Sequence, residues 1–570
     1  MKKFLKYLSL GLLSTIVTAT PGLGAERISF FYPPFGEFSL SADSLEIFAK
    51  EGKINSELAF YARRVTPEQL AQLRELLQQR FNLTPTLVSQ FTYSPIGEAV
   101  VQRLGELVLT DSRQNGFYAI RAALILSAAD PEGLTVVNVL RRFPSTSLRL
   151  NFSEGLQIVN SLSELLAARD QIVAFIQQQT LAQTANATVN FSQQPDLRSP
   201  GKFRWQITSL KLNDDSRNRS LPVDVYVPEA SPQTTANAPT PPFPLVVISH
   251  GLASDRYAFV YLAQHLASHG FAVAVLEHPG SNAERFQLYF SGLAGPPEAQ
   301  EFINRPLDVK YVLDALQRLE KSDPSLQGKL NFQQVGAIGH SFGGYTALAL
   351  AGGKINFEQL REDCFPNRSL NVSTLLQCRA AELPPTNYSL QDDRIKAVIA
   401  INPIDSSVFG QAGVSQIQIP AMLMAGSQDI FAPPVPEQIY PFTWLTNPNK
   451  YLALIENATH FSAIAEPTAE NNVLPVPEAL LGPNRAPAYS YIKALSLAFL
   501  QTHLLNRPEY RSYLQPSYAQ YISQAPLNLS FLQSLTTEQL NQALDGLNPQ
   551  PTVPQPTVPP PSPQPTPASP

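Results

Sequence analysis

The residues with the clearest chemical potential form the sequence GHSFGG at positions 339–344, which contains the pattern Gly-x-Ser-x-Gly. A serine in this pattern can act as a nucleophile when it lies on a sharp turn between a strand and a helix. The pattern alone is weak evidence, because ordinary residue usage produces it by chance about 0.1–0.2 times in a chain of this length. Here an apolar run at 335–339 predicts a buried strand, and residues 341–351 predict a helix. This context favours Ser341 as a nucleophile over a glycine-rich helix start that only packs.

A serine hydroxyl needs a general base, and histidine is the most common one. The strand, turn and helix around Ser341 resemble those of α/β-hydrolases, and this resemblance implies that the acid and then the histidine come later in the chain. Only His460 and His503 satisfy that order, because the other histidines all precede Ser341. His503 lies in an apolar helical segment, whereas His460 lies in a loop directly after the last predicted strand. We therefore predict His460 as the base.

Two aspartates are candidates for the acid that accepts the imidazole N–H and stabilises the imidazolium. Asp429 follows the predicted strand 421–425, and Asp405 follows the predicted strand 397–401. The acid usually follows the strand just before the histidine strand, which favours Asp429. Asp405 stays open as the alternative.

The oxyanion of an acyl-transfer reaction needs two backbone N–H donors near the serine. One donor is expected in the loop after the predicted strand 245–249, where the chain reads SHGL, and the other directly after the nucleophile. We predict the amides of Leu252 and Phe342. His250 precedes Ser341, so it is interpreted as a residue that shapes this loop.

These residues all follow short apolar runs, which must be the elements that position them. The runs alternate with helical segments, and this pattern predicts a mostly parallel sheet with helices on both faces. Two segments with period-two alternation, 205–212 and 223–227, predict a hairpin ahead of that sheet. The predicted parallel strands are residues 245–249, 272–276, 335–339, 397–401, 421–425 and 451–455.

The rest of the chain predicts further regions around this catalytic domain, which is placed at residues 200–545. Residues 26–185 predict a separate, mainly α-helical domain without a catalytic motif, and its apolar helix at 118–128 is expected to be buried. Residues 180–200 are interpreted as a polar linker and residues 231–242 as an exposed loop. Proline-rich residues 546–570 predict an extended tail that acts as a spacer.

The N-terminal residues 1–25 predict a secretory signal peptide, with three lysines followed by a short apolar stretch. Cleavage would place the protein in the periplasm or outside the cell, and an uncleaved anchor is the alternative. No later apolar run is long enough to span a membrane. Cleavage removes three lysines and no acid, so the net charge of -5 becomes -8, which gives no electrostatic reason to bind nucleic acid.

Cys364 and Cys378 are the two cysteines of the chain. Their proximity in an exported protein predicts one disulfide, with a metal pair or two free thiols as alternatives. No cluster of histidines or cysteines accompanies them. We expect neither a metal nor an organic cofactor.

Residues 285–297, RFQLYFSGLAGPP, are predicted to form a loop at the carboxyl end of the strand 272–276. Its apolar residues, Phe286, Tyr289 and Phe290 among them, either pack locally or form a lid or pocket wall over Ser341. An apolar wall suits acyl chains and offers few partners to the amides of a peptide.

Residues 249–280, SHGLASDRYAFVYLAQHLASHGFAVAVLEHPG, together with GHSFGG, resemble the secreted platelet-activating-factor acetylhydrolases. MLMAGSQDIFAPP and YLALIENATHFSAI resemble bacterial cutinases, polyester hydrolases and dienelactone hydrolases. Both resemblances imply the α/β-hydrolase fold with Ser341 as nucleophile. The second implies Asp429 and His460, whereas the first places the acid after the preceding strand and keeps Asp405 open. The helical region resembles a cyanobacterial domain of unknown function that precedes such hydrolases.

The predicted function is a serine carboxylic-ester hydrolase that forms an acyl-enzyme on short or medium acyl esters or lipid esters. A serine peptidase on the same fold is one alternative. A cell-envelope binding protein that carries a relic hydrolase domain is the other. The presence of all three residue types in order favours the enzyme, because a relic would often lose one of them.

Overall fold

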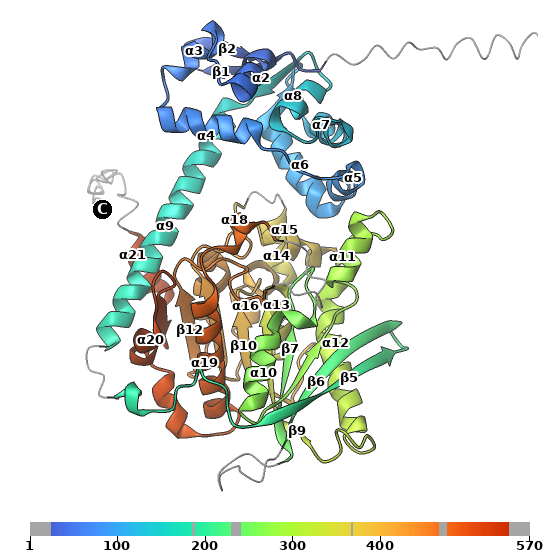
Figure 1. Cartoon of the computed structure of the whole chain (residues 1–570), viewed down its shortest axis with the longest axis vertical. Coiled ribbons are helices and arrows are strands. Elements are labelled where there is room, and N and C mark those ends of the chain that lie inside the picture. Colours follow the sequence, from blue (N-terminus) through green and yellow to red (C-terminus); the bar gives the residue numbers. More distant parts are fainter. Residues whose placement is uncertain are drawn as a thin grey trace, which may run out of the picture.

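The computed structural model describes residues 24–32, 34–184, 189–229, 241–365, 369–466 and 476–545. An N-terminal domain lies above a larger catalytic domain, and one long helix, α9 (Phe152–Thr184), runs from the first to the second (Figure 1). Residues 1–23 of the predicted signal peptide, most of the predicted loop 231–242 and the proline-rich tail lie outside the described residues.

The catalytic domain is built on a nine-stranded sheet, as the alternating apolar runs predict. Its strand order is β13-β12-β11-β10-β9-β7-β8-β6-β5. The six strands from β12 to β8 in this order are parallel to their neighbours, while β13, β6 and β5 are antiparallel. The predicted hairpin is confirmed as β5 and β6, whereas β13 was not predicted. The strands are β5 (Arg204–Asp214), β6 (Arg219–Glu229), β7 (Phe243–Ser249), β8 (Ala272–Leu276), β9 (Leu330–His340), β10 (Ile395–Ile401), β11 (Ala421–Gly426), β12 (Lys450–Ile455) and β13 (Leu529–Leu532).

Helices cover both faces of this sheet, which explains why its central strands are apolar throughout. Val309 of α12 and Leu348 of α13 lie in the core on one face, and Leu262 of α10 and Leu495 of α19 lie in the core on the other. The helices of the domain are α10 (Val260–Ser268), α11 (Ala283–Phe290), α12 (Glu301–Leu319), α13 (Phe342–Leu350), α14 (Phe357–Cys364), α15 (Thr374–Gln377), α16 (Ser406–Val414), α17 (Tyr440–Trp444), α18 (Glu478–Leu481), α19 (Ala486–His503), α20 (Pro516–Ile522) and α21 (Thr537–Leu544).

Helix α11 corrects the first part of the predicted loop at 285–297, whereas residues 291–297 form no helix or strand. Asn282 caps this helix, because its side chain accepts a hydrogen bond from the amide of Arg285. Phe286, Tyr289 and Phe290 follow the i, i+3, i+4 spacing of one helix face. The same spacing is present in the sequence, but the helix is short and glycines and prolines follow it.

The N-terminal domain contains a four-stranded sheet that was not predicted, in the order β2-β1-β4-β3. These strands have three to six residues, too few for a clear period of two, and most of their residues are only partly buried. The strands are β1 (Arg27–Tyr32), β2 (Gly36–Ser41), β3 (Val108–Thr110) and β4 (Ser147–Leu150). The helices are α2 (Ala42–Glu51), α3 (Ser56–Ala62), α4 (Pro67–Gln78), α5 (Pro85–Thr92), α6 (Pro95–Leu107), α7 (Phe117–Ala129) and α8 (Val136–Arg142).

One prediction for the helices of this domain is confirmed and another is wrong in part. The capping box at the start of α4 is confirmed, with Thr66 and Gln69 exchanging hydrogen bonds. The expected burial of α7 is wrong in part, because Tyr118 is 78% exposed and Leu126 is 49% exposed. A helix that is apolar on every side can still lie at the surface of a small domain, which has little interior to offer.

The boundary between the two domains falls within helix α9, earlier in the chain than the predicted linker at 180–200. Ile172 and Ile176, on its C-terminal half, are buried in the core of the catalytic domain. The segment predicted as a linker is not a free connector, because Phe191 and Leu197 are buried in the core on the other face of the sheet. No helix among the described residues is both long and apolar enough to cross a membrane.

Candidate active site

Ser341 lies on the tight turn between β9 and α13. Its backbone has φ 56° and ψ -120°, a strained conformation for a residue with a side chain. A Cβ atom at Gly339 would lie 1.8 Å from the carbonyl oxygen of Gly343, and one at Gly343 would lie 2.1 Å from the carbonyl oxygen of Ser249. The glycines are therefore required because the strand, the turn and the neighbouring strand end approach one another closely.

The structure brings His460 to Asp429. The Nδ1 atom of His460 lies 2.6 Å from Oδ2 of Asp429, which is buried. The other carboxylate oxygen, Oδ1, accepts hydrogen bonds of 2.8 Å from the amides of Phe431 and Ala432. Backbone donors thus fix the carboxylate on one side and leave the other oxygen for the imidazole.

The loop that carries His460 is held by two residues that the sequence reasoning did not assign. His340 Nε2 lies 3.0 Å from the carbonyl oxygen of His460, and Asn402 Nδ2 donates to the same oxygen at 3.4 Å. Complete burial lowers the pKa of His340 well below its usual range, so its ring is neutral and donates one N–H. His340 directly precedes the serine, which links the two loops that form the site.

Asp405, the alternative acid, is not the carboxylate that His460 contacts. Its two carboxylate oxygens are buried without a hydrogen-bond partner among the described residues. Burial, together with the neighbouring Glu437, raises the pKa of Asp405 well above its usual range. The backbone amide of Asp405 donates to Glu437 at 2.8 Å. Asp405 is thus part of a buried acidic pair that the spacing of acids in the sequence could not reveal.

The loop after β7, which carries the predicted donor Leu252, runs beside Ser341. A Cβ atom at Gly251 would lie 3.4 Å from Cβ of Ser341 and 3.1 Å from Nδ1 of His340. Phe342 is the first residue of α13, and the first N–H groups of a helix have no acceptor within the helix. The predicted donors Leu252 and Phe342 therefore lie on the two segments that border the nucleophile.

Buried polar side chains form hydrogen bonds that hold the loop after β7 in place. The guanidinium of Arg305, which is fully buried, donates to the carbonyl oxygen of His250 and to Oγ of Ser281, the latter at 2.7 Å. The amide of His278 donates to Nε2 of His250 at 3.0 Å. His250 thus shapes the loop, in line with its interpretation from the sequence.

Ser249, His278 and Asp308 form a second Ser-His-Asp chain of hydrogen bonds. His278 Nε2 lies 2.9 Å from Oγ of Ser249, and its Nδ1 lies 2.9 Å from Oδ2 of Asp308. All three side chains are at most 3% exposed, and Arg219 also binds Asp308 at 2.6 Å. No substrate can reach Ser249, so we interpret these hydrogen bonds as structural contacts that hold the end of β7. In this group the histidine precedes the acid in the chain, which is the reverse of the order expected for a catalytic triad on this fold.

Ser341 and His460 line the same cavity, which has a volume of about 620 Å³. Nearly all its other walls are apolar, and they include Ile404, Phe431 and Leu480. A second cavity of about 140 Å³ lies next to it. Leu252 and Leu376 line both cavities, so the two form adjacent compartments.

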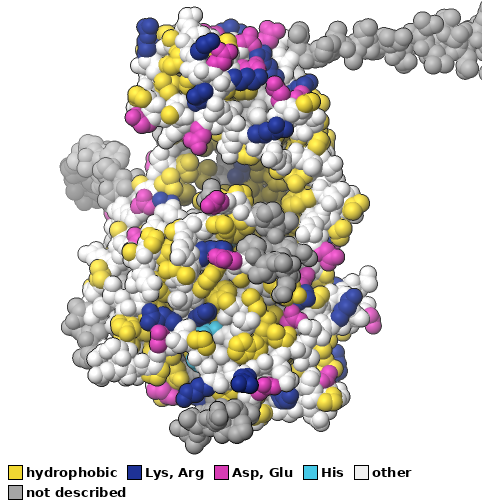
Figure 2. Space-filling model, viewed as in Figure 1, with side chains coloured by type: hydrophobic (Ala, Val, Ile, Leu, Met, Phe, Trp, Pro, Cys, Tyr) yellow, Lys and Arg dark blue, Asp and Glu magenta, His cyan; other side chains and the backbone are white. Residues whose placement is uncertain are grey.

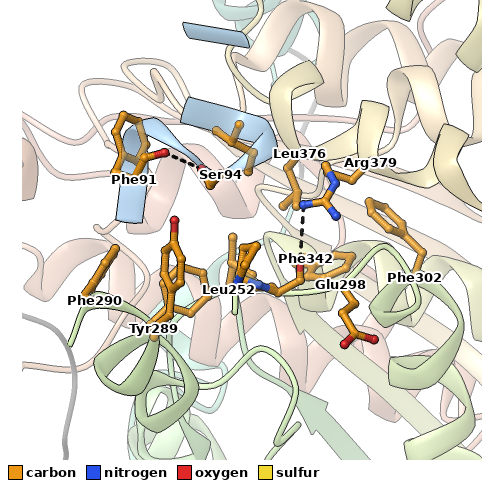
Figure 3. Close-up of a pocket in the computed structure, with 14 residues that line it drawn as sticks. Phe91, Ser94, Leu252, Tyr289, Phe290, Glu298, Phe302, Phe342, Leu376 and Arg379 are labelled. Atoms are coloured by element: carbon orange, nitrogen blue, oxygen red, sulfur yellow. Dashed lines mark hydrogen bonds between the residues drawn. The ribbon is translucent and has the colours of Figure 1, made fainter. Parts of the chain in front are cut away.

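The aromatic residues predicted as a lid belong to the smaller cavity. Phe286, Tyr289 and Phe290 of α11 line it together with Leu252 and Phe342, the two predicted oxyanion residues. Figure 3 shows Tyr289 and Phe290 below this cavity and a helical segment of the N-terminal domain above it. These aromatic residues do not line the larger cavity that contains Ser341.

Cys364, at the end of α14, and Cys378, at the start of η3 (Cys378–Glu382), form a disulfide with a Cα–Cα distance of 5.6 Å. Neither cysteine lines the two cavities. Within the described parts of the chain, no group of three or more histidine, cysteine, aspartate or glutamate side chains is arranged to hold a metal ion.

Comparisons with known proteins agree with this architecture. Residues 244–354 match the family model described as alpha/beta hydrolase fold, and residues 24–151 match one described as an alpha/beta hydrolase of unknown function. The second match covers the N-terminal domain, outside the nine-stranded sheet. The strand order, the turn at Ser341 and these matches define an α/β-hydrolase fold.

The chain is also similar to two curated proteins named platelet-activating factor acetylhydrolase. It is 27% identical to the protein of Cavia porcellus over 135 residues and 29% identical to that of Canis lupus familiaris over 143 residues. Each match covers 19% of this chain and 31% of the relative. The similarity therefore spans about a third of the length of these relatives.

Proposed function

We propose that the protein is a serine carboxylic-ester hydrolase in which Ser341 is the nucleophile, His460 the general base and Asp429 the acid. The observation that carries this proposal is the 2.6 Å contact between His460 Nδ1 and Asp429 Oδ2, because His460 lines the same cavity as Ser341. With Nδ1 engaged by the carboxylate, Nε2 is the atom left to take the proton of the serine hydroxyl.

The proposed reaction has two steps. Ser341 Oγ attacks the ester carbonyl while His460 Nε2 takes its proton, and the oxyanion is bound by the amides of Leu252 and Phe342. His460 then gives this proton to the oxygen of the leaving alcohol, which leaves an acyl group on Ser341. A water molecule, activated by the same imidazole, releases the acid and restores the serine.

The proposed proton transfers indicate which cavity holds the alcohol portion of the ester and which holds the acyl group. The leaving alcohol oxygen must lie next to His460, which lines only the larger cavity. The acyl group then points toward the smaller cavity, which is bounded by the side chains of Leu252 and Phe342 and by the aromatic residues of α11. The volume of about 140 Å³ suits a short or medium acyl group, and the larger apolar cavity suits a lipid-like alcohol. The names of the two relatives, which refer to an acetyl ester, support the same assignment.

The walls argue against a peptide substrate. A bound peptide must pair its amides, and a nearly apolar cavity leaves them without partners at a cost of about 1–3 kcal/mol each. Neither Leu252 nor Phe342 can supply more than its backbone groups, and their side chains are apolar.

The test compares p-nitrophenyl esters, from acetate to laurate, with a peptide p-nitroanilide. We expect hydrolysis of the short and medium esters, a fall in kcat/KM for the long ones and no cleavage of the peptide. Ser341→Ala, which removes the nucleophile and adds no bulk, should lose the activity without a change in thermal unfolding. Faster cleavage of the peptide than of any ester would identify a serine peptidase, and no turnover of any substrate would favour a binding protein.

A further inference from the structure

The N-terminal domain forms part of the two cavities beside Ser341. Phe91, from α5, and Ile96, from α6, line both cavities, and Val100, one turn further along α6, lines the larger one. Figure 2 shows a hollow between the two domains with many hydrophobic side chains around it. In Figure 1, α5 and α6 lie above α11 and α15. Because residues of both helices line the cavities, the two helices form the roof and the catalytic domain forms the floor.

Contacts on either side of the hollow hold this roof in place. On the side of α11, the hydroxyl of Tyr289 donates to the carbonyl oxygen of Gln90 at 2.5 Å, and Tyr289 is buried. At Gly292, a Cβ atom would lie 3.3 Å from the side chain of Thr86, so α11 and α5 approach closely there. On the side of α6, Arg103 donates to the carbonyl oxygen of Ser369 at 2.9 Å.

Helix α9 anchors the domain to the catalytic machinery from a third direction. The side chain of Arg169 donates to Oε1 of Gln428 at 2.9 Å, and Gln428 directly precedes Asp429. Further along α9, Thr180 accepts a hydrogen bond of 3.2 Å from the amide of Phe531, in the edge strand β13. The N-terminal domain is thus tied to the catalytic domain around the cavities, while the space above Ser341 stays open and apolar.

We infer that the N-terminal domain is a substrate-binding cap, and that Ile96 and Val100 determine which apolar alcohol groups the enzyme accepts. The inference rests on the proposed function, since it assigns the larger cavity to the alcohol portion of the ester. A domain that only packed against the enzyme would close its interface with matched side chains, as protein interiors do. Here the contacts form a rim, and the residues between them face the cavity of the nucleophile instead.

The expected effect follows from the transfer of methylene groups out of water. Burial of one methylene contributes about 0.8 kcal/mol, so each methylene that reaches the cavity raises kcat/KM by up to about fourfold. A tryptophan at Val100 fills part of the space under the roof. It should therefore penalise long alcohols and spare short ones, because only the long chains extend to α6.

The experiment measures kcat/KM of the full-length protein for ethyl, butyl, octyl and dodecyl acetate, with the acyl group kept constant. Wild type should prefer the longer alcohols. Val100→Trp should reduce the ratio of kcat/KM for octyl acetate to that for ethyl acetate by more than about tenfold, which equals the loss of about two buried methylenes. Val100→Ala should keep or extend the preference for long chains.

Leu104→Trp is the matched control, since Leu104 lies on the next turn of α6, is 41% exposed and does not line the cavities. It should behave as wild type on every acetate. Thermal unfolding and the rate of inactivation by a small organophosphate check that each variant is folded with an intact nucleophile.

The outcomes distinguish failure of the cap assignment from failure of the proposed function. If wild type hydrolyses the acetates in a manner that depends on Ser341, but Val100→Trp keeps the wild-type profile, the cap assignment is wrong and the proposed function stands. An equal loss in Val100→Trp on ethyl and octyl acetate would also overturn it, because a damaged fold and not a filled cavity would be the cause. If wild type hydrolyses no acetate, the proposed function itself fails.

Discussion

Replacement of Asp429 by asparagine should place an NH₂ group where His460 now contacts a carboxylate oxygen. In the native protein Oδ1 accepts two backbone N–H groups at 2.8 Å, and Oδ2 faces His460 Nδ1 at 2.6 Å. An asparagine has one oxygen and one NH₂ group at these two positions. The two backbone donors select the oxygen, so the NH₂ group must face the imidazole.

An NH₂ group at this position donates to Nδ1 and favours the tautomer of His460 that carries its proton on Nε2. That tautomer has no lone pair on Nε2 to take the proton from Ser341. The expected loss in kcat is about 10⁴-fold, equal to about 5.4 kcal/mol of transition-state stabilisation. The fold should be retained, because the hydrogen bonds of the side chain to Phe431 and Ala432 remain.

Asp405→Asn is the matched control, since it makes the same chemical change at the alternative acid. Asp405 has a raised pKa and no bond to His460, so an amide should leave kcat close to the wild-type value. The assay is single-substrate kinetics on p-nitrophenyl butyrate for both variants, with circular dichroism to verify the fold. The reasoning is refuted if Asp405→Asn is the more damaging change, or if Asp429→Asn keeps most of its activity.

Three further changes test other parts of the account. Phe286→Ala combined with Phe290→Ala enlarges the smaller cavity and should shift the best acyl length upward in the p-nitrophenyl ester series, and an unchanged profile would remove these residues from the acyl pocket. Asp405→Asn should raise Tm more at about pH 8 than at about pH 4. The pKa of the buried Asp405 carboxyl is raised, so this carboxyl destabilises the native state as the pH rises above the ordinary aspartate pKa. A Tm difference that does not change with pH would contradict the raised pKa as its cause. Arg305→Lys should lower kcat more than it raises KM, because a lysine cannot hold His250 and Ser281 together and the oxyanion loop loses its register; a pure increase in KM would argue against that role.

Much of the catalytic domain could be predicted from the sequence because its strands are buried on both faces. The runs at 245–249, 272–276 and 335–339 are apolar throughout and each ends at a polar or glycine-rich turn. The expected order of serine, acid and histidine then limited the candidate bases to two histidines. The structure brings one of them, His460, to Asp429. Periodicity and chain order are local signals, and here they agree with the tertiary structure.

The remainder depends on contacts between segments far apart in the chain. The strands of the N-terminal sheet are short and half-exposed, so no alternation marks them. Asp405 and Asp429 look alike in sequence, and only the position of Glu437 beside Asp405 shows that this carboxyl belongs to a buried pair. The buried chain of Ser249, His278 and Asp308 is likewise invisible without the fold.

The roof over the active site could not be predicted for the same reason. Phe91 and Val100 lie 250 and 241 residues before Ser341 and belong to helices with no catalytic motif. Their apolar side chains are typical of any amphipathic helix. Only the contacts of α11 with α5 and the course of α9 place them above the nucleophile.

The most direct test of the central claim is to trap the acyl-enzyme. The protein is mixed with p-nitrophenyl acetate, quenched with acid within the first turnover and digested for mass spectrometry. We predict one acetyl group on the peptide that contains Ser341, formed in step with a burst of p-nitrophenol, and none in Ser341→Ala. An acetyl group on another residue, or steady hydrolysis in Ser341→Ala, would contradict the assignment of Ser341 as the nucleophile.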